Sequence, residues 1–242
     1  MAKWQERTEL LLKKEGLEKL KKATVLVVGV GGVGSFAVEF LVRAGVGNVT
    51  IIDGDDVDST NINRQLPALH STVGKFKVDV VGERLLDINP DLNLNKIKEF
   101  LTPERAFEVV ATNFDYVLDC IDSVTPKLNL ILGAKRKRVK IISSMGAGGK
   151  MEASKVKVAD IGTTTNCMFA KTIKKRLKEH KIDKLKVVFS SEIQDESSLK
   201  LTDGSNFKKS FYGTNSYMPA LFGLYMAETV IRYLISDRIA RH

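Results

Sequence analysis

The chain has 242 residues, of which 43% are apolar, and 38 basic against 29 acidic residues give it a formal net charge of +9. This composition excludes a disordered chain, because it allows a substantial core in one large domain or in one domain with an appended lobe. The charge predisposes the protein toward polyanions, although a lysine-rich proteome would give the same excess.

The ends of the chain predict neither a signal peptide nor a membrane span. Residues 1–22 are charged and lack an uninterrupted apolar core. Residues 218–235 are apolar and long enough to cross a bilayer, but Glu228 and Arg232 interrupt them, which favours a buried helix. We therefore expect a cytoplasmic protein without a membrane span.

An amphipathic helix is predicted to open the chain, and lysines fill its polar side. Four leucines at helical spacing supply the apolar side, namely Leu10, Leu11, Leu17 and Leu20.

Strands and helices then alternate as far as residue 143. In chain order the segments are strand 23–28, helix 33–44, strand 48–53, helix 75–88, strand 94–97, helix 103–110, strand 116–119, helix 125–138 and strand 140–143. The first strand is a continuous valine-rich run, as in strands that are buried on both faces of a parallel sheet. This alternation predicts an α/β fold with a Rossmann-like, doubly wound, mostly parallel sheet.

The pattern changes after the glycine-rich segment 145–149. Strands 155–159 and 186–189 are predicted around a basic helix at 166–180, and helix 217–235 closes the chain. The polar segment 190–213 has no apolar period and is expected to form a mobile loop. We divide the chain into a Rossmann-like half, 1–150, and a smaller C-terminal half, 151–242, which together form one continuous domain.

A glycine-rich loop, Gly29-Val-Gly-Gly-Val-Gly34, joins the first strand to its helix. Such a loop turns tightly and points the first helical N–H groups at a phosphate. Asp53 ends the next strand, 19 residues after Gly34, where a carboxylate can bind a ribose hydroxyl. Together these features predict an adenosine nucleotide site, and tight strand–helix packing without a ligand is the alternative.

Charged residues farther along favour ATP over NAD or FAD. The carboxyl ends of parallel strands meet at one edge of the sheet, so Arg64, Lys77 and Asp122 are expected to converge beside the glycine loop. Cations stabilise a phosphorus under attack, and an aspartate can hold a bridging Mg²⁺. A dehydrogenase needs none of these cations against its pyrophosphate.

At these residues the chain resembles the ubiquitin-activating superfamily of adenylyltransferases, whose small bacterial members serve molybdopterin and thiamine biosynthesis. The likeness runs from Arg7 to about Gly149. Within that superfamily the chain most resembles the tRNA threonylcarbamoyladenosine dehydratases, and this narrower likeness spans nearly the whole chain. It is carried by residues 7–11, 61–65, 70–74, 143–148 and 186–190 and by the last helix.

The resemblance implies a role for each matching residue. The ATP phosphates would lie against Gly29, Gly31, Gly32 and Gly34. Asp53 would hold the ribose, and Asp55 is included in the site, although capping the strand end is its alternative role. The triphosphate and its transition state would be stabilised by Asn61, Arg64 and Lys77. Asp122 would position Mg²⁺, and Arg7 would reach the ATP of a partner subunit in a homodimer.

The implied reaction has two steps. The carboxylate of the threonylcarbamoyl group attacks the α-phosphorus of ATP and releases pyrophosphate, and the acyl-adenylate then cyclises and expels AMP. Because the second nucleophile belongs to the substrate, no protein nucleophile is required. Cys167 is a candidate nucleophile all the same, but a lone cysteine is more often a small buried residue.

Two basic clusters suggest contact with tRNA, although a charge run is usually a solvated helix face. One lies within residues 171–186 and the other is Lys135–Arg138. Three other functions stay open: an adenylyltransferase that activates a sulfur-carrier protein, an NAD-dependent oxidoreductase, and a non-catalytic RNA-binding scaffold. The two cysteines cannot form the four-cysteine zinc site of many sulfur-carrier enzymes. The sequence does not decide whether a sulfur-transfer partner assists.

Overall fold

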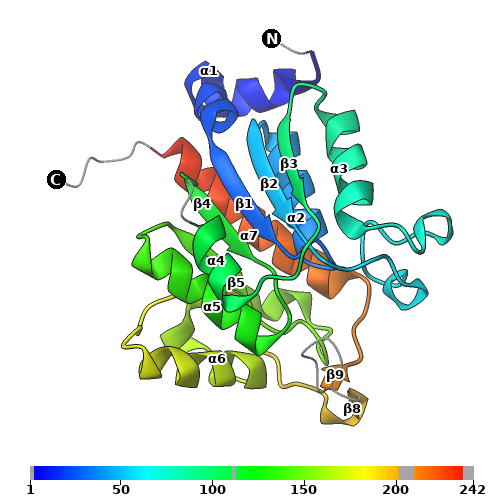
Figure 1. Ribbon diagram of the computed structural model, residues 1–242, viewed down its shortest axis with the longest axis vertical. Coiled ribbons are helices and arrows are strands. Elements are labelled where there is room, and N and C mark those ends of the chain that lie inside the picture. Colours follow the sequence, from blue (N-terminus) through cyan, green and yellow to red (C-terminus); the bar gives the residue numbers. More distant parts are fainter. Residues whose placement is uncertain (1–2, 111–112, 202–209, 237–242) are drawn as a thin grey trace.

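A computed structural model describes residues 3–110, 113–201 and 210–236. Its centre is a seven-stranded sheet in the order β3-β2-β1-β4-β5-β7-β6 (Figure 1). All neighbouring strands are parallel except β6, which runs antiparallel to β7 at one edge. The predicted Rossmann-like, mostly parallel sheet is therefore confirmed.

The strands are β1 (Thr24–Val28), β2 (Asn48–Ile52), β3 (Asn93–Ile97), β4 (Tyr116–Asp119), β5 (Ile141–Ser144), β6 (Val156–Asp160) and β7 (Lys186–Ser190). The α-helices are α1 (Glu6–Lys22), α2 (Gly34–Ala44), α3 (Lys77–Ile88), α4 (Pro103–Val109), α5 (Val124–Arg136), α6 (Met168–Glu179) and α7 (Tyr217–Ile235). Each predicted element of the sheet and its helices is present, with bounds shifted by up to two residues.

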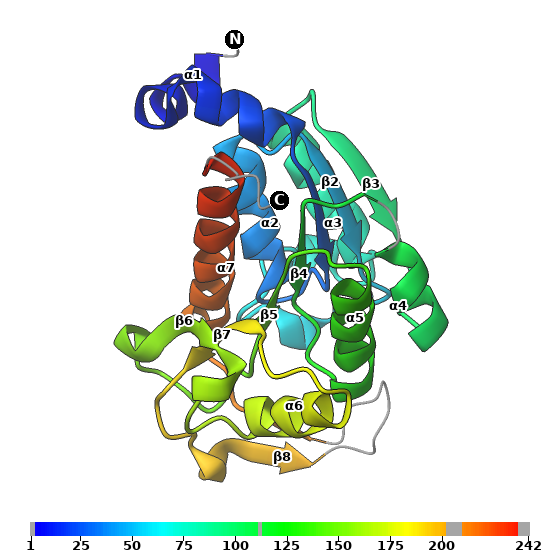
Figure 2. The ribbon, with the colours of Figure 1, turned by 90° about the vertical axis from the view of Figure 1, so that its left-hand side faces the viewer.

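Helices cover both faces of the sheet (Figure 2). One apolar core lies between the sheet and α2, α3 and α7, and includes Val38, Val78 and Met226. A second core on the opposite face includes Ala106, Leu130 and Ile173, which come from α4, α5 and α6. Because both faces of the central strands are buried, these strands contain continuous apolar runs.

Strands from the C-terminal half extend the same sheet, since β7 pairs with β5 and β6 pairs with β7. The final helix α7, from the C-terminal half of the chain, lies beside α2 of the Rossmann-like half (Figure 1). The division of the chain at residue 150 remains a prediction.

The opening helix differs from the prediction in its apolar side. Leu17 and Leu20 are buried as expected, but Leu10 and Leu11 are 68% and 79% exposed. The helix is interrupted at Lys13, whose φ of 62° is not helical. The chain changes direction at this kink, so the two parts of α1 are not collinear. The apolar side of the second part therefore does not continue along the first part, which carries Leu10 and Leu11.

The segment 190–213, for which a mobile loop is predicted, also includes regular structure. It contains a short antiparallel pair, β8 (Leu199–Leu201) with β9 (Ser210–Tyr212), and residues 202–209 lie outside the described part. Backbone hydrogen bonds anchor the segment to the 145–149 loop, because Asp195 N donates to Gly149 O at 2.8 Å and Gly149 N donates to Gly213 O at 2.7 Å. Because the segment is polar and has no apolar period, the sequence pattern did not predict these contacts.

No helix in the described ranges is long and apolar enough to cross a membrane. This agrees with the prediction that residues 218–235 form a buried helix, since Met218, Phe222 and Met226 are fully buried.

A buried carboxylate joins α2 to α3. Glu39 is 8% exposed and accepts hydrogen bonds from Arg43 Nε at 2.8 Å and from Arg84 Nε at 2.6 Å. Burial raises the pKa of Glu39, but the hydrogen bonds from Arg84 and Arg43 outweigh it and leave the pKa below its usual value of 4.5. The resulting stability is present above this value and is lost as the pH falls through the lower pKa of the folded state.

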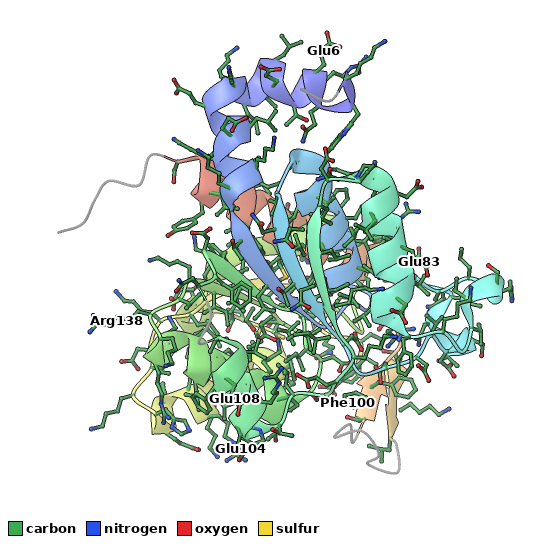
Figure 3. The ribbon with its side chains drawn as sticks, turned by 45° about the horizontal axis from the view of Figure 1, so that its top comes forward. Glu6, Glu83, Phe100, Glu104, Glu108 and Arg138 are labelled. Carbon is green, nitrogen blue, oxygen red and sulfur yellow. The ribbon has the colours of Figure 1, made fainter. Side chains whose placement is uncertain are left out.

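We expect Glu39→Gln to lower the free energy of unfolding by about 2 kcal/mol near neutral pH, because it removes charged hydrogen bonds. The difference from the wild type should shrink as the pH falls below 4.5, the ordinary value for this carboxyl. Urea denaturation at several pH values measures both effects. Glu83→Gln, at an exposed position on α3 (Figure 3), is the matched control. An E39Q–wild-type difference that grows with acidification would contradict the prediction.

Candidate active site

The carboxyl ends of β1, β2 and β4 meet at one edge of the sheet. Gly29 N donates to Ile52 O at 2.7 Å, and Cys120 N donates to Val28 O at 2.9 Å, so the turns after these three strands are held together. This edge carries the glycine loop, the Asp53–Asp55 turn and the turn that leads to Asp122. Ligands bind at such an edge in open α/β sheets.

Three of the loop glycines are required by close approach of other segments. Gly29 has a φ of +85°, and a β-carbon there would lie 3.0 Å from Cys120 O. A β-carbon at Gly34 would overlap the carbonyl oxygen of Gly29, and one at Gly32 would lie 3.1 Å from Pro219 Cβ of α7. These glycines are thus needed for packing whether or not a phosphate binds to the loop.

Gly31 is the exception among the four. Its added β-carbon would lie 3.4 Å from Gln65 Oε1, which is ordinary contact. Gln65 Oε1 is buried and has no hydrogen-bond partner among the described residues. A buried acceptor without a partner beside the loop calls for an explanation, and a bound ligand supplies one.

Asp53 fixes the loop to the end of β2. Its Oδ2 accepts from Val30 N at 2.7 Å, and its Oδ1 accepts from Asp55 N at 2.9 Å. Burial raises the pKa of Asp53, while nearby Lys77 opposes the rise. Each carboxylate oxygen keeps a further lone pair, so a ribose hydroxyl can still donate to it.

Lys77 begins α3 and is 5% exposed. Its Nζ lies 2.8 Å from Asp55 Oδ2. The structure therefore brings together two predicted site residues that are 22 positions apart, and places a buried ammonium group beside Asp53 at the sheet edge. Asn61 is also buried, at 8% exposure, and its Oδ1 accepts from Asp58 N at 3.3 Å.

Arg64 and Asp122 interact electrostatically across the same edge. Burial lowers the pKa of Arg64, and the charge of Asp122 opposes that shift. The Arg64 guanidinium is oriented by Nη1, which donates to Thr60 O and to Asn63 Oδ1, both at 2.8 Å. The backbone of Arg64 also lies beside the glycine loop, since a β-carbon at Gly32 would lie 3.5 Å from Arg64 O.

Arg7 is the predicted site residue that the structure does not bring to this edge. It lies in the first turn of α1, and α1 precedes β1 at the amino end of the sheet (Figure 1). Glu6, the neighbour of Arg7, lies far from Phe100, which follows β3 on the carboxyl side (Figure 3). Any contact of Arg7 with ATP would have to be with the ATP of another subunit.

A buried charge cluster under the site is missing from the sequence prediction. Lys127 Nζ lies 2.8 Å from Asp119 Oδ2 and 3.1 Å from Ser143 Oγ, and all three side chains are fully buried. Asp119 Oδ1 also accepts from Ile121 N at 3.2 Å, which shapes the turn before Asp122. The sequence contained one indication of this cluster. Lys127 occupies an apolar-facing position of a predicted helix, eight residues after Asp119 at the end of a strand.

Both cysteines lie at positions with little exposure to solvent. Cys167 is 7% exposed and caps α6, where its Sγ accepts from Ala170 N at 3.5 Å. Burial raises the pKa of Cys120, which disfavours its thiolate. Both thiols are free.

The edge therefore combines a glycine loop at a helix start, two cations and several carboxylates. This set can hold a triphosphate and stabilise charge on its phosphorus. A nicotinamide dinucleotide would leave Lys77 and Arg64 without a function. The roles of the individual residues remain predictions.

Comparison with known proteins agrees with this chemistry. The chain matches the ThiF family over residues 5–241. It is 40% identical over 239 residues to the tRNA threonylcarbamoyladenosine dehydratase of Bacillus subtilis (strain 168), covering 96% of this chain and 94% of the relative.

Solved structures of the corresponding E. coli enzyme are similar along the whole chain. Its complex with ATP has a TM-score of 0.88 and 31% identity, and the match covers 100% of this chain and 99% of that one. Its complex with AMP has a TM-score of 0.87 and 32% identity, covering 97% of this chain and 96% of that one.

Proposed function

Because the chain belongs to the ThiF family and, within it, to the tRNA threonylcarbamoyladenosine dehydratases, we propose that it adenylates the carboxylate of threonylcarbamoyladenosine in tRNA and cyclises the product. The observation that supports the proposal is the placement of two cations near the predicted site: Lys77 pairs with Asp55 beside Asp53, and Arg64 interacts electrostatically with Asp122. The substrate is inferred from the name of the relatives, and the use of ATP is inferred from the arrangement of charged residues at the sheet edge.

In the first step a carboxylate oxygen of the substrate attacks the α-phosphorus of ATP. The bond from that phosphorus to the bridging oxygen breaks, and pyrophosphate leaves. Lys77 and Arg64 stabilise the negative charge that builds on the phosphate oxygens, while the N–H groups of the glycine loop hold the phosphates in place.

In the second step an atom of the same threonylcarbamoyl group attacks the acyl carbon. The bond from the acyl carbon to AMP breaks, the nucleophile loses its proton, and the ring closes with net loss of water. Intramolecular attack has a high effective concentration, so neither cysteine is required.

Mg²⁺ is part of the proposal. Asp122 is the residue that would hold it, together with phosphate oxygens of ATP, and the ion would neutralise phosphate charge. Among residues 3–110, 113–201 and 210–236, no three or more His, Cys, Asp or Glu side chains cluster to hold an ion by themselves. Mg²⁺ bound to a nucleotide uses only one or two carboxylates besides the phosphates, so this donor set fits it.

The tRNA substrate is proposed to lie along α6. The buried side of this helix is Ala170, Ile173 and Leu177, and Lys175 and Lys178 are exposed on its outer side. α6 begins beside the 145–149 loop at the carboxyl edge of the sheet, whereas α5 runs away from that edge and ends at Arg136. The α6 cluster is therefore the better placed of the two predicted basic clusters.

A Lys175→Ala/Lys178→Ala variant should bind tRNA less tightly, and the slope of log affinity against log salt should fall by about two, because each phosphate contact contributes about one. Filter binding of tRNA across a salt series measures this. Lys137→Ala/Lys140→Ala, two exposed lysines beyond the end of α5, serve as the control pair. An unchanged slope for the α6 variant would remove α6 from the tRNA surface.

The proposal also covers the oligomeric state and the cellular location of the protein. We infer a homodimer in which Arg7 reaches the partner's ATP, since its own site lies at the other end of the sheet. A cytoplasmic location follows from the tRNA substrate. A sulfur-transfer partner is left open, because the proposed cyclisation uses no sulfur.

The proposal is tested by mass spectrometry of the product nucleoside. The protein is incubated with ATP, Mg²⁺ and tRNA that carries threonylcarbamoyladenosine, and the tRNA is then digested. Loss of one water that depends on ATP is expected, with unmodified tRNA as the control. An unchanged mass, with AMP and pyrophosphate formed only when a sulfur-carrier protein is added, would instead support the sulfur-carrier adenylyltransferase.

A further inference from the structure

A cavity of about 390 Å³ lies between the start of α6 and the segment that follows β7. Its lining residues belong to the segments 164–174 and 193–196, and none of the predicted ATP-site residues is among them. Its volume lies in the range of small-ligand pockets. The cavity is therefore distinct from the predicted ATP site.

The 145–149 loop separates this cavity from the ATP site. On the cavity side, Gln194 Nε2 donates to Gly148 O at 3.0 Å, and a β-carbon at Gly146 would lie 3.5 Å from Phe169 Cβ. On the other side, a β-carbon at Gly148 would lie 3.0 Å from Thr214 Oγ1, and Thr214 O accepts from Asn63 Nδ2 at 2.8 Å. Asn63 in turn orients Arg64, so the cavity adjoins the catalytic edge.

A buried lysine holds the two walls of the cavity together. Lys150 is 2% exposed, and its Nζ donates to Asn166 O at 3.0 Å in one wall and to Glu192 O at 2.9 Å beside the other. A third bond, to Ser190 O at 2.8 Å, joins the end of β7. Because all three N–H groups of the Lys150 ammonium donate to backbone carbonyls, Lys150 fixes the shape of the cavity without filling it.

The lining combines three kinds of group. Met168 and Ile193 are apolar side chains that are 55% and 79% exposed, and exposed apolar side chains of this size are suited to contact a partner. Lys171 and Lys174 line the cavity too, together with one carboxylate, Glu196.

Hydrogen-bonding capacity also remains in the lining. Gln194 keeps a buried Oε1 that has no partner among the described residues. Thr164, Thr165 and Asn166 add further polar groups. Apolar surface for a base, lysines for a phosphate and polar groups for base edges are what recognition of a single unstacked nucleotide requires.

We propose that this cavity receives the modified adenosine of the tRNA, with the base against Met168 and Ile193 and an adjacent phosphate at Lys171 and Lys174. From there the carboxylate of the threonylcarbamoyl group passes the 145–149 loop to reach the α-phosphorus. This inference rests on the proposed function and names the substrate subsite of the same reaction.

The test compares two pairs of exposed apolar residues. Met168→Ser/Ile193→Ser alters the cavity, and Leu199→Ser/Leu201→Ser alters β8, whose residues do not line it. Affinity is measured without ATP for one tRNA species with and without its threonylcarbamoyl group, and dehydration by the wild type is followed in parallel. ATP binding by each variant reports that the fold is intact.

We expect only the modified adenosine to be held in the cavity, because an unmodified adenosine has no threonylcarbamoyl carboxylate to extend past the 145–149 loop. The cavity variant should therefore lose about tenfold in affinity for the modified tRNA, the scale of one lost base contact, and change less than about twofold for the unmodified tRNA. The β8 variant should match the wild type. Equal losses in both variants, or a wild type that does not discriminate between the two tRNAs, would overturn the cavity assignment.

The two proposals can fail separately. A wild type that dehydrates the tRNA while the cavity variant keeps full discrimination would refute the subsite and leave the proposed function standing. A wild type that discriminates through the cavity but never removes water would refute the proposed function alone.

Discussion

Lys77→Met is expected to slow pyrophosphate formation at least about 100-fold, since removing one preorganised charge that stabilises a transition state costs this much or more. Lys77 is 5% exposed, and its ammonium group lies 2.8 Å from Asp55 at the edge where the α-phosphorus would be attacked. A group that is already desolvated and held in place needs no reorganisation during the reaction.

The fold should survive this change. The Asp55 side chain is 44% exposed, so water can hydrate it when Lys77 is lost. The rate is measured as tRNA-dependent release of pyrophosphate, and ATP affinity is measured separately. Lys75→Met, at an exposed position two residues earlier, is the matched control. Retention of more than about half the wild-type rate would show that Lys77 is a structural partner of Asp55, because catalytic groups cost far more when removed.

Lys127→Met is expected to lower the free energy of unfolding by about 3–5 kcal/mol, because it leaves the Asp119 carboxylate buried without its cation. Both side chains are completely buried, with 2.8 Å between Lys127 Nζ and Asp119 Oδ2. Removal of the cation also releases Ser143, the other partner of Lys127, from one hydrogen bond.

A second variant separates the lost charge from the lost packing. Lys127→Met/Asp119→Asn removes both charges, while the amide can still accept from Ile121 and donate to Ser143, so most of the stability should return. Lys155→Met is the matched control: this lysine pairs with Glu152 on the surface, and its loss should change the free energy of unfolding far less than the loss of Lys127. Guanidinium denaturation measures all three, and equal losses for Lys127→Met and Lys155→Met would contradict the prediction.

Much of the nucleotide edge could be predicted from sequence because its signals are local. A valine-rich strand, a glycine loop and a helix are consecutive in the chain, and Asp53 ends the next strand of the same βαβ unit. The parallel strands then place their carboxyl ends at one edge, so Arg64, Lys77 and Asp122 were expected there without any contact being known.

The partners of buried lysines could not be predicted in this way, even where a helix position such as that of Lys127 indicates burial. Lys127 and Lys150 are among the largest fully buried side chains. Their partners are provided by Asp119 and Ser143 in one case and by three backbone carbonyls in the other. Carbonyl partners leave no trace in residue type, so sequence patterns cannot reveal them.

The α/β sheet and the glycine loop can be predicted from the sequence, since they depend on backbone geometry and on the order of strands and helices, and the same order suggests which residues could bind a triphosphate. Which surfaces are covered follows from the packing of segments far apart in the chain. Leu10 and Leu11 are exposed because α1 turns at Lys13, Gly32 is confined by Pro219 from the far end of the chain, and the 164–174 and 193–196 segments line a cavity. Hydrophobic periodicity reports that one side of an element is apolar, whereas the segment that covers that side is set by packing between residues far apart in the chain.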